Sequence, residues 1–181
     1  DAANVYYRRS TDNGATWQPE IKVNDDATTT DQYQPSLSVG EGNVLAVGYY
    51  SRQNDVANNL LLDYYSRVSY NGGVTWQPST RLSDVSSSVV LDPNLADCYH
   101  GDYDTQIHRP GAAQYLWSDD RNPGVTGADP NIYTESTPAG VDFLVLSAAS
   151  SQSICASANA VYPIDVFQFQ GFAETVNLSA T

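Results

Sequence analysis

Positive charge is scarce in this chain of 181 residues. Eight Lys and Arg residues, among them the single lysine Lys22, stand against 21 Asp and Glu residues, and the formal net charge is −13. Phosphate binding needs a basic surface, so we predict no nucleic-acid partner. An anionic membrane surface would repel the chain for the same reason.

Long apolar runs and methionine are also missing. No segment is long enough to span a bilayer, so membrane insertion is not expected. No signal peptide opens the sequence, and Asp1 leads almost directly into a strand, which is expected of a mature or trimmed chain. The two cysteines, Cys98 and Cys155, form either one disulfide in an oxidising compartment or two buried thiols.

Tyrosine is abundant, with 13 residues, alongside many Ser, Thr, Asn and Asp residues. This composition predicts an extracellular all-β protein with long polar loops. Alternating or apolar segments predict strands at 4–9, 20–23, 36–39, 44–50, 60–66, 80–82, 103–108, 114–117 and 131–134. Residues 44–50 are apolar almost without interruption, which predicts burial on both faces of that strand.

One octet occurs twice. Ser-Thr-Asp-Asn-Gly-Ala-Thr-Trp at 10–17 returns 59 residues later (69 minus 10) as Ser-Tyr-Asn-Gly-Gly-Val-Thr-Trp at 69–76. The glycine permits a positive φ, the Asp or Asn side chain can bond the turn backbone, and the tryptophan starts the next strand. Both copies therefore predict a hairpin turn, whose defining residues are Ser10, Asp12, Gly14, Thr16, Trp17, Ser69, Asn71, Gly73, Thr75 and Trp76.

The octet resembles the Asp box of the sialidase-like (BNR-repeat) β-propellers, Ser-x-Asp-x-Gly-x-Thr-Trp. Residues 10–17 match fully, and Asn71 replaces the aspartate in the second copy. In that family the box joins the third and fourth strands of a blade, away from the active site. The resemblance implies a structural role for the box and about two propeller blades within residues 1–136, preceding a linker at 137–141.

Residues 142–181 have a different sequence pattern from the preceding part of the chain. This part resembles the opening of an Ig-like module found beside secreted bacterial propellers. The resemblance rests on a Phe-bearing strand, Ser-Gln-Ser at 151–153, a Tyr-bearing strand, Gly-Phe at 171–172 and Val-Asn-Leu-Ser at 176–179. The expected fold is thus all-β, a partial propeller followed by an incomplete Ig-like β-sandwich. Two blades do not close a ring of about 4–8 blades, so we expect further chain or other copies to complete both parts.

The resemblance to sialidases implies an arginine cluster for the substrate carboxylate, a tyrosine nucleophile with its glutamate, and an acid/base aspartate. No arginine here lies in the Arg-Ile-Pro or Arg-Leu-Pro setting of the first sialidase arginine. Arg8 and Arg67 precede the two boxes at equivalent positions, which favours a structural role. We therefore predict no catalytic residue, and an exo-sialidase-like glycoside hydrolase remains the enzymatic alternative.

Aromatic and polar residues near the predicted strand ends suit carbohydrate, because ring faces stack on sugars and polar groups bind hydroxyls. The same rings could equally form blade cores. The candidate ligand-binding residues are Tyr49, Arg52, His100, Asp102, Tyr103, Trp117, Asp119 and Arg121. Asp25, Asp26 and Asp31 form a possible calcium site without EF-hand spacing, or else a solvated acidic loop.

These observations together predict a secreted, non-catalytic extracellular binding or scaffold module of a sialidase-like propeller protein. Glycans or a cell-surface polymer are the expected ligands. The alternatives are a piece of an exo-sialidase, and a self-assembling structural subunit that exchanges strands between copies.

Overall fold

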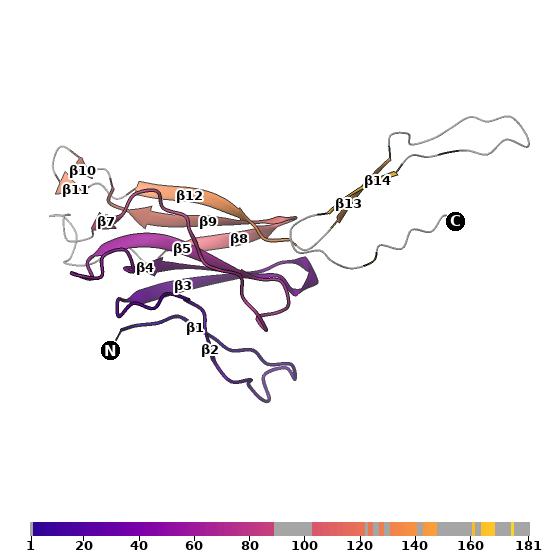
Figure 1. Ribbon diagram of the computed structural model, residues 1–181, viewed down its shortest axis with the longest axis horizontal. Coiled ribbons are helices and arrows are strands. Elements are labelled where there is room, and N and C mark those ends of the chain that lie inside the picture. Colours follow the sequence, from indigo (N-terminus) through magenta and orange to yellow (C-terminus); the bar gives the residue numbers. More distant parts are fainter. Residues whose placement is uncertain are drawn as a thin grey trace, which may run out of the picture.

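The computed structural model describes residues 2–88, 103–121, 123–124, 127–128, 131–140, 143–147, 161, 164–168 and 175. The regular secondary structure of the described residues is β-strand, apart from one 3-10 turn, η1 (Glu41–Asn43). Three antiparallel sheets lie one above another (Figure 1). Within the described residues none of these sheets closes on itself. No described helix is long and apolar enough to cross a membrane.

The three sheets contain two, four and three main strands. The first sheet pairs β1 (Tyr6–Tyr7) with β2 (Ile21–Lys22). The middle sheet has the order β3 (Gln32–Val39), β4 (Leu45–Ser51), β5 (Leu61–Ser69) and β6 (Thr80–Arg81). The third sheet has the order β8 (Thr105–Arg109), β9 (Ala112–Asp119) and β12 (Asn131–Pro138). This grouping confirms the predicted strand succession.

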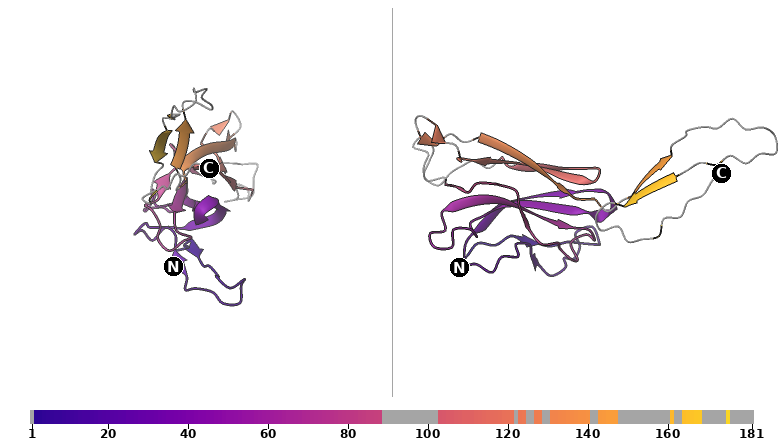
Figure 2. Two further views of the ribbon diagram at one scale, coloured as in Figure 1. Left: turned by 90° about the vertical axis from the view of Figure 1, so that its right-hand side faces the viewer. Right: turned by 45° about the horizontal axis from the view of Figure 1, so that its top comes forward.

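Shorter strands lie outside this stack. β7 (Ser87–Ser88) pairs with the start of β5, and β10 (Pro123–Gly124) pairs with β11 (Gly127–Ala128). β13 (Phe143–Ser147) and β14 (Ile164–Gln168) form an antiparallel pair that projects away from the three sheets (Figures 1 and 2). All-β structure is therefore established for the described part.

The 59-residue repeat is reproduced in strand register. Tyr6 lies opposite Lys22 in the first sheet, and Tyr65 lies opposite Arg81 in the middle sheet. The same offset relates two backbone bonds that close the hairpins, Val23 N–H to the Val5 carbonyl and Leu82 N–H to the Tyr64 carbonyl, both 2.8 Å. The octets are therefore equivalent parts of two similar hairpins.

Both octets form the predicted turn. The hydroxyls of Ser10 and Ser69 each accept the backbone N–H four residues later, at 2.8 Å. Glycines at the fifth position have φ of 88° and 82°, which glycine adopts without strain. The Asp12 side chain accepts from the Thr16 backbone N–H and hydroxyl, at 2.9 and 2.5 Å. In the second turn the Asn71 side chain also accepts a hydrogen bond from the Thr75 backbone N–H, at 2.9 Å. Its amide group, however, donates to the Thr75 hydroxyl, at 2.9 Å.

Two apolar cores hold the sheets together. Val5 and Val23 of the first sheet pack with Tyr49 and its neighbours on one face of the middle sheet. The opposite face of the middle sheet packs, through Tyr50 and Tyr64 among others, on the third sheet. Every residue of β4 is accordingly buried, as predicted for a strand between two layers, whereas β9 is buried at alternate positions.

Several strand boundaries differ from the prediction, and two of the differences involve a proline. β3 begins at Gln32, and its pairing with β4 shifts between Tyr33 and Ser36, where Gln34 has a φ of 54°. A bulge accommodates Pro35, which lacks the N–H for regular pairing. β12 continues to Pro138, two residues into the predicted linker, because proline is tolerated at the end of an edge strand.

Candidate functional site

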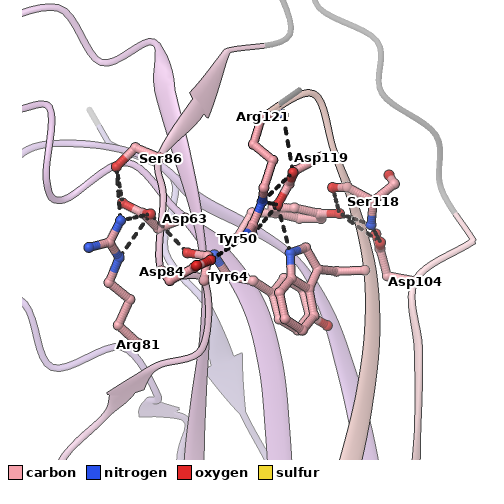
Figure 3. A network of polar contacts seen from close by, with 12 residues as sticks. Tyr50, Asp63, Tyr64, Arg81, Asp84, Ser86, Asp104, Ser118, Asp119 and Arg121 are labelled. Carbon is pink, nitrogen blue, oxygen red and sulfur yellow. Dashed lines mark hydrogen bonds and ion pairs between the residues drawn. The ribbon is translucent and has the colours of Figure 1, made fainter. Parts of the chain in front are cut away.

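The turns and loops of the stack gather at two opposite ends. At the box end, the backbone N–H of Gly72 donates to the Asn43 carbonyl, and Arg9 Nη1 donates to the Gly72 carbonyl at 3.1 Å. The loop end comprises residues 24–31, 52–60, 84–86, 103–104 and 119–121. These loops hold most of the candidate residues, and Figure 3 shows the polar contacts that join several of them.

Asp63, at the start of β5, is the most connected group of the loop end. Its buried carboxylate accepts from Arg81 Nε and Nη2 at 2.9 and 2.6 Å, and from Asn54 Nδ2 at 2.6 Å. The Ser83 hydroxyl donates to the same carboxylate at 2.8 Å. The Ser86 hydroxyl completes its shell at 3.0 Å (Figure 3). A fully satisfied buried carboxylate fixes the positions of its donors and has little capacity left for a ligand.

Arg121 and Asp119 form a second polar group, at the end of β9. Arg121 Nη2 lies 2.6 Å from Asp119, Nη1 contacts Asp84, and the guanidinium stacks on the Tyr133 ring at 3.8 Å. The pKa of Arg121 is raised, mainly by its hydrogen bonds to Asp119. Trp117 Nε1 also donates to Asp119, at 3.1 Å. The pair thus joins the end of β9 to the segment after β6.

Tyr50 and Asp104 resemble, at first sight, the tyrosine and carboxylate of a nucleophilic pair. The Tyr50 hydroxyl donates to Asp104 Oδ1 at 2.7 Å, and Gln34 Nε2 donates to Asp104 Oδ2 at 2.6 Å. However, the Tyr50 ring is buried, and burial followed by the charge of Asp104 raises its pKa. A phenol that holds its proton this firmly is a poor nucleophile, and the contact instead joins the middle and third sheets.

The predicted ligand-binding residues separate into different environments. Tyr49 and Trp117 lie in the two cores, where Trp117 stacks on Tyr64 at 5.1 Å, so neither ring is open to a sugar. Arg52 lies over the Tyr33 ring at 5.3 Å and donates to the Asn59 carbonyl at 2.7 Å. The remaining predictions, His100, Asp102 and the cysteines Cys98 and Cys155, lie outside the described residues.

Tyr103 is the candidate aromatic residue that is exposed, with 93 % of its surface accessible. It borders a cavity of about 260 Å³ on the outer face of the third sheet, lined also by Asp104, Leu116 and Ile132. Ile132 is 76 % exposed and was missed from the sequence. The signal was available, because in a strand the side chains of Ile132 and Tyr133 must point to opposite faces. We call this cavity the Tyr103 groove.

The three aspartates of the calcium prediction have separate partners. Asp25 accepts the Ser79 N–H at 2.9 Å, Asp26 accepts Asn24 Nδ2 at 2.7 Å, and Asp31 accepts the Ala3 N–H at 2.9 Å. The Ala3 N–H is the main cause of the lowered pKa of Asp31. No three His, Cys, Asp or Glu side chains in the described ranges are grouped so as to hold a metal ion. This geometry gives the calcium prediction no support.

No protein-family model matches the chain, and no curated protein matches it significantly.

Proposed function

We propose that this chain is a non-catalytic binding and scaffold module of a secreted sialidase-like β-propeller protein, and that its ligands are glycans. The stacked antiparallel sheets and the two equivalent box hairpins support blades as the architecture. The acidic net charge of −13 suits a soluble extracellular surface.

The hydrogen bonds of the arginine side chains support the non-catalytic part of the proposal. A sialidase site aims several guanidinium groups at one substrate carboxylate. Here Arg8 Nε and Arg67 Nε donate to the carbonyls of Gln18 and Gln77, at 3.0 and 2.6 Å, in the two equivalent hairpins. Each of the seven arginines donates a hydrogen bond to an acceptor within the chain. These residues are Arg8, Arg9, Arg52, Arg67, Arg81, Arg109 and Arg121.

The Tyr103 groove supports glycans as the ligand class. An exposed phenol ring next to the aliphatic Ile132 offers an apolar platform, and Thr105 and Ser118 add polar groups at its border. Sugar rings present this combination of apolar C–H faces and hydroxyls. The hydroxyl of Tyr103 supplies a polar end to an otherwise apolar ring.

A glycan array tests the proposal. The chain should bind at least one class of glycan on the array, and Tyr103→Ala should weaken this binding at least tenfold. Tyr6→Ala is the matched control, because Tyr6 is also exposed, at 53 %, but lies on the first sheet. An array without retained glycans, or equal losses in both variants, would contradict glycan binding. Release of the fluorophore from a fluorogenic sialoside would contradict the non-catalytic role.

A further inference from the structure

Two asparagines of the box turns are followed directly by glycine. The pairs are Asn13–Gly14 in the first turn and Asn71–Gly72 in the second, and no other asparagine of the sequence precedes a glycine. The backbone nitrogen of a following glycine can reach the asparagine side-chain carbonyl, because glycine has no Cβ to hinder the approach. Asparagine is also one of the chemically labile residues of proteins. The chain therefore offers two identical reactive pairs in different surroundings.

The Asn13–Gly14 pair lies at the open tip of the first turn. Asn13 is exposed, and its side chain has no hydrogen-bond partner among the residues that the structure describes. No described atom lies within 4 Å of the position that a side chain on Gly14 would take. The Gly14 N–H donates to the hydroxyl of the half-buried Ser10 at 2.8 Å, an acceptor that water can replace when the turn opens. The tip can thus rearrange without displacing packed neighbours.

The Asn71–Gly72 pair is held by several contacts. The Asn71 side chain accepts the Thr75 backbone N–H and donates to the Thr75 hydroxyl, at 2.9 Å in each case. The Gly72 N–H donates to the Asn43 carbonyl at 2.9 Å, and the Gly72 carbonyl accepts from Arg9 Nη1 at 3.1 Å. Bringing the Gly72 nitrogen to the Asn71 side chain would break these contacts, so the fold protects this pair.

We infer that Asn13 deamidates spontaneously in the folded protein, whereas Asn71 is protected by its turn. The Gly14 backbone nitrogen attacks Cγ of Asn13, and the side-chain amide leaves as ammonia with the N–H proton. The resulting succinimide is opened by water at either of its carbonyls, which leaves aspartate or isoaspartate at position 13. The overall reaction consumes water and releases ammonia, and it needs no oxidant or reductant.

Both products change the first turn without reaching a packed core. Each adds a negative charge beside Asp12, and isoaspartate also lengthens the main chain of the turn by one carbon. The longer chain displaces the Gly14 N–H from the Ser10 hydroxyl, the contact that both boxes share. Trp17 at the end of this turn is 56 % exposed, so the change remains local. Deamidation therefore makes the two box turns chemically different.

Peptide mapping measures the two sites separately in the unmodified protein. Trypsin, which cleaves after lysine and arginine, releases residues 10–22 and 68–81, and each peptide contains a single asparagine. The folded chain is incubated at mildly alkaline pH, digested and analysed by mass spectrometry. Deamidation of 10–22 should be at least tenfold faster than that of 68–81. In guanidinium chloride, where neither turn is formed, the two rates should become similar.

A matched pair of variants tests the protection of Asn71. Thr75→Val removes the hydroxyl that holds the Asn71 amide and should speed deamidation of 68–81 severalfold. Thr16→Val makes the same change in the first turn and should leave the rate for 68–81 unchanged. Equal rates at the two sites in the folded chain, a tenfold difference that persists in guanidinium chloride, or equal effects of the two variants would overturn the inference.

Discussion

The two box hairpins share their internal bonds but have different neighbours. Both turns have the same serine and threonine contacts, with the donor reversed where Asn71 replaces aspartate. Trp17 of the first hairpin is 56 % exposed, whereas Trp76 packs on Tyr7 of the preceding sheet. The box sequence thus determines the turn, and the position of the hairpin in the stack determines how much its tryptophan stabilises the fold.

Replacing the buried acid at the start of β5 should give the largest difference between the repeats. Asp63→Ala removes five hydrogen-bond contacts to a buried carboxylate and should lower the free energy of unfolding by about 3 kcal/mol. The equivalent residue, Asn4, accepts one bond from Asn24, so Asn4→Ala should cost about 1 kcal/mol.

Urea denaturation followed by far-ultraviolet circular dichroism measures both free energies of unfolding. Equal losses in the two variants would show that the hydrogen-bond network around Asp63 adds nothing to the shared hairpin geometry.

Alanine variants of the two tryptophans should show a smaller difference in unfolding free energy, again with the larger loss in the second hairpin. Trp76→Ala removes the packing between the first and middle sheets and should cost about 2 kcal/mol of unfolding free energy. Trp17→Ala removes a ring that is mostly in solvent and should cost about 0.5 kcal/mol. Thermal unfolding monitored by circular dichroism compares the variants, and a Trp17→Ala loss as large as that of Trp76→Ala would contradict the difference in neighbours.

The smallest expected difference is in pH dependence. Hydrogen bonds from Ser10 and Thr16 lower the pKa of Asp12 to about 2. A lowered pKa in the folded state means that this stabilisation is present above the unfolded pKa, near 4, and is lost as the pH falls towards 2. Asn71 has no such titration. Asp12→Asn should therefore flatten the dependence of unfolding free energy on pH between about 4 and 2, and Asn71→Asp should steepen it.

Unfolding titrations at fixed urea across this pH range make the comparison. Indistinguishable slopes for the wild type and Asp12→Asn would show that the first turn does not depend on the charge of Asp12.

Local patterns in the sequence predicted most of the described stack. The octets specified both turns because their contacts span four residues, and the apolar run at 44–50 predicted a strand buried on both faces. The bulge at Gln34 was missed, since it depends on how β3 meets β4. The candidate site was less predictable, because Tyr49 and Tyr103 are the same residue type and only the tertiary packing buries one and exposes the other. The assignment of blades, the Ig-like module and secretion remain predictions from resemblance and composition.

The middle sheet has cores on both of its faces. Disrupting β4 would therefore expose apolar surface on both faces of the middle sheet at once. The two-stranded first sheet would keep little structure once it is separated from the middle sheet. Loss of structure in residues 2–88 should consequently be concerted, with amide hydrogens of β4 exchanging only through rare global opening.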